Sequence, residues 1–147
     1  MTAEALAALH ARCFDTGPPP WSAASFVGLL EDPACFLLAR PGGFALGRAA
    51  AGEAELLTIA VAPEARRGGV GRALLAAFEA EATRRGAEEA FLEVSEANAA
   101  ARALYAGAGY SVAGRRPGYY RRADNSPVAA LTLRKRLRNP CRVPKTD

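Results

Sequence analysis

The sequence has few of the residues that build metal centres and disulfide frameworks. It holds three cysteines and one histidine in 147 residues, and no two cysteines stand in a C-x-x-C spacing. An odd number of scattered cysteines argues against a disulfide framework and a zinc site, and favours the reducing cytosol. We therefore expect no metal and a cytoplasmic location, with Cys13 and Cys35 as small buried apolar residues.

Long apolar runs are also absent, since none approaches the roughly 20 residues that a membrane span requires. The first ten residues, M-T-A-E-A-L-A-A-L-H, carry an early acid and an amphipathic period, so we expect no secretory signal. The length predicts one domain, which we place at residues 1–137, with a polar C-terminal tail at residues 138–147. The net charge of +4 suggests an anionic ligand or partner.

Hydrophobic periodicity and turn residues predict an alternation of helices and strands. The expected helices are residues 2–14, 23–31, 69–85 and 98–108. The expected strands are residues 35–39, 44–49, 55–61, 90–95, 110–114 and 128–133. Antiparallel strands come first and a strand–helix–strand crossover follows, which predicts an α/β (α+β) fold with one mixed sheet and helices on both faces. We expect residues 115–127 to form a basic, aromatic loop and residues from 134 onward to form a tail.

The stretch R-R-G-G-V-G-R-A-L-L, residues 66–75, puts glycines and arginines directly before a helical run. The first N–H groups of a helix have no internal partner, and the helix dipole leaves positive charge there. Glycines let a phosphate approach the backbone, and Arg66, Arg67 and Arg72 add full charges. The loop lacks the lysine of a nucleotide P-loop and the third glycine of a dinucleotide motif. It favours a phosphate or pyrophosphate site, and the alternative is an ordinary turn with solvated arginines.

A second group of polar residues lies in F-L-E-V-S-E-A-N-A-A-A-R-A-L-Y, residues 91–105. Glu93 stands among apolar residues of a predicted strand, so its carboxylate must face solvent, a partner or a cleft. Asn98 and Tyr105 lie about two helical turns apart and share a helix face. Asn98 fits an N-cap, with or without a ligand contact, and Tyr105 fits a packed aromatic. Together, a strand carboxylate and a helix phenol can act as general base and general acid across one cleft.

Three motifs together resemble the signatures of the GNAT N-acetyltransferases. R-R-G-G-V-G at residues 66–71 is similar to [QR]-x-x-G-x-[GA], which in that superfamily binds the pyrophosphate of acetyl-coenzyme A (acetyl-CoA). The preceding L-T-I-A-V-A-P-E resembles the superfamily's central strand, and N-A-A-A-R-A-L-Y-A-G-A-G-Y is similar to its N-x-x-A-x-x-L-Y-x-x-x-G-[FY] motif. The resemblance covers residues 2–137 and implies a mixed, mostly antiparallel central sheet. The family begins with a short strand before its first helix, and we expect that strand to be missing here.

Three further stretches resemble the ribosomal-protein-alanine N-acetyltransferases, the RimI type: P-W-S at residues 20–22, L-E-V at 92–94 and R-R-P-G-Y-Y at 115–120. By this resemblance Glu93 is the proton acceptor and Tyr105 the proton donor. The implied coenzyme-binding residues are Ile59, Ala60, Val61, Arg66, Arg67, Gly68, Gly69, Val70, Gly71, Arg72 and Asn98. The implied acceptor-binding residues are Trp21, Arg116, Tyr119 and Tyr120. Residues 123–127 depart from the family pattern, which leaves the acceptor specificity open.

The resemblance implies direct transfer of an acetyl group from acetyl-CoA to the N-terminal α-amine of a protein. No residue argues for a covalent nucleophile, and His10 fits a core or surface role beside the apolar stripe of the first helix. The implied partners are acetyl-CoA and a protein N-terminus, with a ribosomal protein as the model case; we expect no membrane partner and no direct nucleic-acid binding. One alternative acceptor is a lysine or a small-molecule amine. Another reading is a basic RNA- or ribosome-binding module without catalysis, because R-R-P-G-Y-Y-R-R interleaves cations with aromatics.

Overall fold

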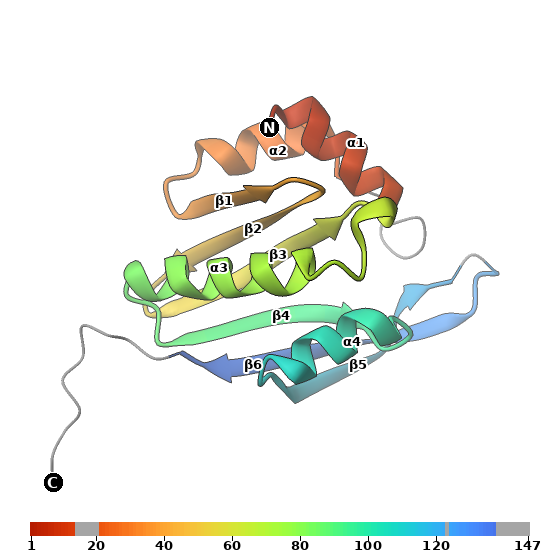
Figure 1. Cartoon of the computed structure of the whole chain (residues 1–147). Helices are drawn as coiled ribbons and strands as arrows, with labels where there is room; N and C mark the ends of the chain where they lie inside the picture. The colour runs from red at the N-terminus through yellow and green to blue at the C-terminus, as the bar shows by residue number, and fades with distance from the viewer. Residues whose placement is uncertain (14–20, 123, 138–147) are drawn as a thin grey trace, which may run out of the picture.

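The described residues of this computed structural model, 1–13, 21–122 and 124–137, form four α-helices, one short 3-10 turn and six strands (Figure 1). The helices are α1 (Ala3–Cys13), α2 (Ala23–Glu31), α3 (Val70–Arg84) and α4 (Ala99–Gly107), and the 3-10 turn is η1 (Pro63–Ala65). The strands are β1 (Cys35–Arg40), β2 (Gly43–Ala50), β3 (Glu53–Val61), β4 (Glu89–Ser95), β5 (Ser111–Arg121) and β6 (Pro127–Arg136). Every predicted element is present in the predicted order, and the boundaries differ substantially only in β5 and β6.

The strands form one sheet in the order β1-β2-β3-β4-β6-β5. Neighbouring strands are antiparallel except β3 and β4, which are parallel and are joined by the crossover through α3. The predicted mixed, mostly antiparallel sheet is therefore confirmed. No strand precedes α1 within residues 1–13. None of the helices in the described residues is both long and apolar enough to cross a lipid bilayer.

Successive residues of β2 point into two different cores, because neighbouring side chains of a strand face opposite sides of the sheet. Ala45 belongs to the larger core, together with Leu74 and Phe78 of α3. Phe44 and Leu46 belong to the smaller core, with buried residues of α1 and α2. The sheet thus has α3 and α4 on one face and α1 and α2 on the other (Figure 1), which confirms the prediction of helices on both faces.

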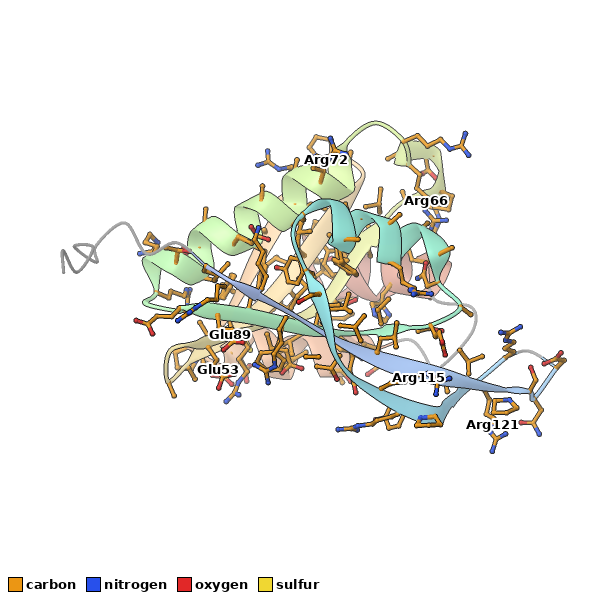
Figure 2. The ribbon with its side chains drawn as sticks, turned by 90° about the horizontal axis from the view of Figure 1, so that it is seen from below. Glu53, Arg66, Arg72, Glu89, Arg115 and Arg121 are labelled. Carbon is orange, nitrogen blue, oxygen red and sulfur yellow. The ribbon has the colours of Figure 1, made fainter. Side chains whose placement is uncertain are left out.

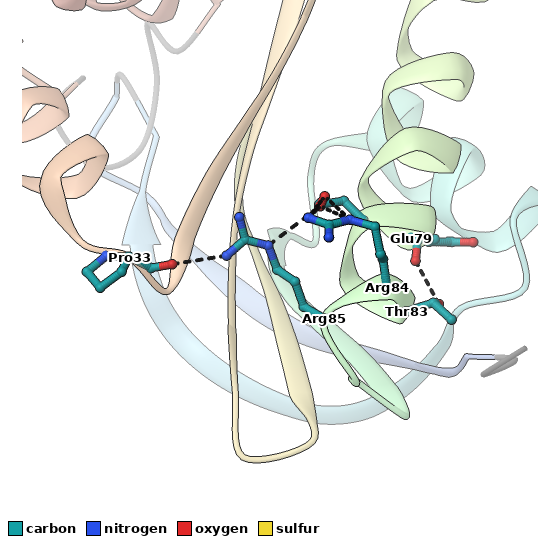
Figure 3. A network of polar contacts seen from close by, with 6 residues as sticks. Pro33, Glu79, Thr83, Arg84 and Arg85 are labelled. Carbon is teal, nitrogen blue, oxygen red and sulfur yellow. Dashed lines mark hydrogen bonds and ion pairs between the residues drawn. The ribbon is translucent and has the colours of Figure 1, made fainter. Parts of the chain in front are cut away.

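The C-terminal end of α3 is fixed to the segment before β1 by an arginine (Figure 3). A guanidinium N–H of Arg85 donates to the carbonyl oxygen of Pro33 at 3.0 Å, and its Nε lies 3.6 Å from Oε2 of Glu81. The same guanidinium lies 4.7 Å from the centroid of the Phe36 ring, within the range of a cation–π contact. These contacts join the C-terminal end of α3 to β1 and to the segment that precedes it.

Strands β3 and β4 pair only near their beginnings. Residues 53–55 of β3 lie opposite residues 89–91 of β4, and beyond them the two strands diverge (Figure 1). A bulge at Leu57 accompanies the divergence, because the register of β2 with β3 shifts there by one residue. We call the two unpaired stretches, residues 56–61 of β3 and residues 92–95 of β4, the fork.

Two predictions about the C-terminal third of the chain are wrong. The predicted loop over residues 115–127 is a strand as far as Arg121, because its main chain pairs with β6. The side chains of this edge strand are mostly exposed and polar, so the sequence shows no apolar alternation that would predict a strand. Pro117 and Gly118 lie in a register shift of this hairpin, as turn-forming residues in strands often do. The predicted tail from residue 134 begins instead with strand residues, since β6 pairs with β4 as far as Arg136. Residues 138–147, including Cys141, lie outside the described residues.

Candidate active site

At the end of β3, part of the main chain faces away from the neighbouring strand β2. The N–H of Ala62 donates to the carbonyl oxygen of Gly42 at 2.7 Å, and in an antiparallel ladder every second residue bonds to the partner strand. Ala60 therefore directs its main-chain groups toward β2, whereas Ile59 and Val61 direct theirs toward the fork. The carbonyl oxygen of Val61 accepts from the Cys13 thiol at 3.3 Å and from Nε of Arg66 at 3.1 Å.

Of the two cysteines predicted to be buried, Cys35 is buried and Cys13 is only partly buried. The Cys13 thiol therefore behaves as a hydrogen-bond donor beside the fork, and the prediction of a fully buried apolar residue is wrong for it.

The glycine loop leads directly into α3, as the sequence predicts. Gly69 is the N-cap residue, with a φ angle of 80° and no side-chain hydrogen bond, so no side chain competes for the first N–H groups of the helix. Arg67 also has a positive φ angle, 68°. Arg66 and Arg72 flank the loop at this end of α3 (Figure 2). A left-handed residue before a helix N-terminus, with cations around it, fits an anionic phosphate group.

Helix α4 closes the same region from the side. The side-chain oxygen of Asn98 accepts from the N–H of Ala101 at 3.1 Å, so the predicted N-cap is confirmed, while contact with a ligand stays a prediction. A Cβ placed on Gly71 would lie 3.5 Å from Leu104 of α4 and 3.7 Å from Val61 of β3. The first turn of α3, the end of β3 and the middle of α4 therefore converge, and any larger side chain at residue 71 would project between them.

Tyr105 is buried in the core beneath α3 and α4. Its ring packs edge-on against Tyr110, with the ring centroids 5.9 Å apart, and the residue is 5% exposed. Burial raises the pKa of the Tyr105 phenol above its ordinary value, so the hydroxyl keeps its proton. This confirms a packed aromatic, while the role of its phenol as a proton donor stays a prediction.

Glu93 lies on the opposite face of the sheet from Tyr105. Its neighbours in β4, Leu92 and Val94, belong to the same core as Tyr105, and Glu93 alternates with them. The predicted pair is therefore not on one face. Only a group that passes through the fork can contact both side chains.

Three of the four predicted acceptor-binding residues gather near Glu93. A guanidinium nitrogen of Arg116 lies 3.8 Å from Oε1 of Glu93, and the same guanidinium lies 5.3 Å from the centroid of the Tyr119 ring. The rings of Tyr119 and Tyr120 are in edge contact at 5.0 Å. Burial, and then the charge of Glu93, raise the pKa of Tyr120. The β5–β6 hairpin thus brings two phenols and a guanidinium to the base candidate.

Trp21, the fourth predicted acceptor-binding residue, packs in the smaller core. Its ring stacks on His10 at 5.2 Å and lies 5.5 Å from the ring of Phe26, and the main-chain N–H of Trp21 donates to Nδ1 of His10 at 3.2 Å. Packing explains Trp21 without an acceptor, so its contact with a substrate stays a prediction. His10 is 5% exposed, which confirms the core role and gives it no part in the fork.

Sequence reasoning missed Glu55. This residue lies on β3 just before the fork, alternates with the core residues Ala54 and Leu56, and so shares the face of Glu93. Burial, and then the charge of Glu93, raise the pKa of Glu55, while Arg48 opposes the shift. The alternation E-A-E-L in the sequence was the available signal, since it turns a second acid toward the same face as Glu93.

No cluster of three or more metal-ligating His, Cys, Asp or Glu side chains occurs in the part of the chain that the structure describes. The polar groups at the fork are instead main-chain amides, arginines, phenols and carboxylates. They suit an organic anion on the α3 side and an amine on the Glu93 side.

Comparisons with known proteins identify the family and the fold of this chain. The family model described as Acetyltransferase (GNAT) family matches residues 4–110. The ribosomal-protein-S18-alanine N-acetyltransferase from Escherichia coli superposes with a TM-score of 0.84 and 29% identity, over 99% of this chain and 92% of that one. Ard1 from Thermoplasma volcanium superposes with a TM-score of 0.78 and 25% identity, over 92% and 91%. Nourseothricin acetyltransferase superposes with a TM-score of 0.64 and 28% identity, over 73% and 68%. A search of curated protein sequences finds no significant match.

Proposed function

Because this chain belongs to the acetyltransferase (GNAT) family, we propose that it transfers the acetyl group of acetyl-CoA to the N-terminal α-amine of a protein. The implied acceptor is an N-terminal alanine of a ribosomal protein, by likeness to the Escherichia coli enzyme. The observation that carries the proposal is the position of Glu93 beside the fork, with Arg116 of the β5–β6 hairpin 3.8 Å away. Support for an acceptor on this side of the sheet comes from this contact between the carboxylate of Glu93 and the β5–β6 hairpin.

The residues on the α3 side fit acetyl-CoA, which supplies the activated thioester when it is bound. The loop from Arg66 to Arg72 offers left-handed backbone at Gly69, uncapped helix N–H groups and three guanidinium groups, and so suits the pyrophosphate. Ile59 and Val61 offer main-chain groups to the pantetheine arm. Asn98 would contact the same arm, while Ala60 keeps β3 in register with β2.

The residues around the fork can then move two protons. Glu93 takes one proton from the acceptor ammonium, directly or through a water, before the neutral amine attacks, and the nitrogen releases its second proton after the N–C bond has formed. The N–H of Val61 polarises the carbonyl group that is attacked. Tyr105 gives its proton to the departing sulfur as the C–S bond breaks. The raised pKa of Tyr105 keeps this donor protonated until it is needed.

The basicity of the acceptor favours an α-amine. A protein α-amine has a pKa of about 8, whereas a lysine side chain has a pKa of about 10.4. One carboxylate suffices to deprotonate the α-amine at neutral pH, whereas the lysine amine would require a stronger base. The acid-lined face of the sheet shows no further base candidate of the histidine type in the described residues, since His10 is buried in the smaller core.

The proposal is tested by mass spectrometry of a peptide panel incubated with acetyl-CoA and the purified protein. The panel pairs peptides that begin with a free alanine with the same peptides carrying a blocked N-terminus and a free lysine. We expect acetylation of the free N-terminus only. Acetylation of the lysine peptides or of a small-molecule amine would assign the acceptor to another class, and no acetylation of any amine would overturn the proposal.

A further inference from the structure

Glu55 is a partly buried carboxylate with no cation at contact distance among the described residues, although the charge of Arg48 acts on it from the neighbouring strand. Among the described residues its side chain takes part in no ion pair within 4.0 Å and in no hydrogen bond, although the residue is partly buried. Its cross-strand neighbour Arg48 instead lies 3.6 Å from Asp32. A carboxylate that is partly removed from water is stabilised by a positive partner, and here the protein does not provide one at contact distance.

The neighbouring acids of the same face differ from Glu55 in this respect. Glu53 and Glu89 lie opposite one another in the β3–β4 register, and a guanidinium nitrogen of Arg134 lies 3.3 Å from the first and 3.4 Å from the second. Figure 2 shows this pair at one end of the sheet, with Arg115 and Arg121 along the hairpin toward the other end. The lack of a partner is thus particular to Glu55 and does not extend to all the acids of this face.

Glu55 faces Glu93 at the point where the strands part. Glu55 lies opposite Phe91 in the register, and Glu93 is the next residue of β4 on the same face. The other charged or titratable groups near this pair are Arg48 on β2, Arg116 and Tyr120 on β5, and Arg134 on β6, whose guanidinium lies 5.0 Å from the centroid of the Phe91 ring. Only Arg116 of these reaches a carboxylate of the pair, and its contact is a long one with Glu93.

We propose that Glu55 is a positioning residue that holds the ammonium group of the acceptor beside Glu93, in the place that a protein cation leaves free. The inference rests on the proposed transfer to an amine and adds a residue that selects cationic acceptors. Glu55 binds the ammonium as a charge-assisted hydrogen-bond acceptor, and Glu93 takes the proton. Glu55 itself forms and breaks no covalent bond.

The first test separates binding from chemistry. In Glu55→Gln we expect KM for an alanine peptide to rise about tenfold, the effect of one hydrogen bond to a charged group, with kcat within about twofold of the parent. KM for acetyl-CoA should not change. The matched control is Glu53→Gln, which removes a carboxylate from the same strand and face and should leave all three constants unchanged. A loss of kcat in Glu55→Gln would indicate that Glu55 is the general base. Values of kcat and of both KM constants equal to those of Glu53→Gln would indicate that Glu55 has no role. Either result overturns the proposal.

The second test needs no turnover and so stands apart from the proposed function. Carboxyl carbons of glutamate are followed by NMR through a pH titration, and we expect Glu93→Gln to lower the pKa of Glu55 while Glu89→Gln leaves it unchanged.

Calorimetry then compares an alanine peptide with its N-acetylated form, each added to the protein saturated with CoA. We expect the free peptide to bind and to bind about tenfold more weakly to Glu55→Gln, in line with one lost charged hydrogen bond. Equal binding of both peptides, or an unmoved titration of Glu55, would overturn the pairing even if acetyl transfer is observed.

Discussion

Glu93 and Tyr105 lie on opposite faces of the sheet. Leu92 and Val94, on either side of Glu93 in β4, share a core with Tyr105, so the sheet itself separates the carboxylate from the phenol. Where two strands pair, the sheet keeps the side chains of its two faces apart. Here β3 and β4 stop pairing after residues 55 and 91. Under the proposed function the thioester would lie in this gap, with the acceptor on the face of Glu93 and the coenzyme on the face of Tyr105.

The role of Glu93 predicts a pH-dependent defect in Glu93→Gln. We expect kcat at neutral pH to fall about 10²-fold, as is typical when a general base is removed. The deficit should shrink as the pH rises above about 8, because the α-amine then loses its proton without help. Steady-state rates across that range measure the effect, with coenzyme affinity as the internal reference. Glu89→Gln is the control, since Glu89 lies on the same face of β4 and pairs with Arg134; an equal loss in both variants would count against the base.

The role of Tyr105 predicts a defect that depends on the leaving group. Tyr105→Phe should slow transfer about 10²-fold if the phenol protonates the sulfur. A thioester with a more acidic thiol should restore part of the rate, since its thiolate leaves without a proton. The control is Tyr110→Phe, which alters the neighbouring ring in the same core and removes a hydroxyl that faces the Glu79 carboxylate. We expect that variant to keep its rate, and full activity of Tyr105→Phe would reduce Tyr105 to a packing role.

Sequence alone located most of the candidate site because its residues lie in local patterns. The glycine loop, the Asn98 cap and the Tyr105 helix each depend on neighbours within a few residues, and local chemistry predicts them well. Glu55 was missed because its significance depends on β4, about 38 positions further along the chain, and no local pattern shows where two strands stop pairing. The strand over residues 115–121 was missed for a related reason, since its partner β6 comes later in the sequence.

The opposite faces of Glu93 and Tyr105 were open to prediction but were not recognised. Alternation in F-L-E-V places Glu93 on the opposite face of the strand from Leu92 and Val94. A helix that packs on Leu92 and Val94 therefore lies on the other side of the sheet from Glu93. What alternation could not show is which face α4 covers, because that depends on the connection from β4 through α4 to β5, which passes over a strand, β6, that comes later in the sequence. Trp21 shows a limit of motif resemblance. The motif predicted that Trp21 binds the acceptor, whereas in the structure its ring packs on His10.

The left-handed Arg67 allows charge and backbone shape to be tested separately. Because its φ angle is 68°, Arg67→Gly relieves a conformation that costs an L-residue about 1 kcal/mol, so the variant should keep its stability. The lost guanidinium should weaken binding of acetyl-CoA about tenfold if it contacts the pyrophosphate. Calorimetry gives the affinity and urea unfolding gives the stability. Arg136→Ala, at the exposed end of β6, is the control for a change in net charge, and equal weakening by both would leave the loop without a specific role.

His10 predicts a loss of stability in mild acid. Burial lowers the pKa of His10 below its ordinary value of about 6.5, so the unfolded chain takes up a proton more readily than the folded one. Stability from this group is therefore complete above about pH 6.5 and declines as the pH falls below that value. Urea unfolding between pH 5 and 8 should show the decline, and His10→Phe, which keeps a ring against Trp21, should flatten it. A decline of equal size in the variant would assign the acid sensitivity to other groups.

Gly47 predicts a packing defect that leaves the site untouched. A Cβ at this position would lie 2.6 Å from Cζ of Phe36 and 2.7 Å from Cε1 of Phe78, whose rings stack at 5.8 Å between β1 and α3. Neither ring can withdraw without opening the larger core, so Gly47→Ala should lower the free energy of unfolding by about 1–3 kcal/mol. Gly28→Ala is the matched control, because a Cβ there meets nothing within 4 Å and alanine favours the helix by about 1 kcal/mol. Urea unfolding of the two variants should therefore give changes of opposite sign, and a stable Gly47→Ala would show that the stacked rings have room to move.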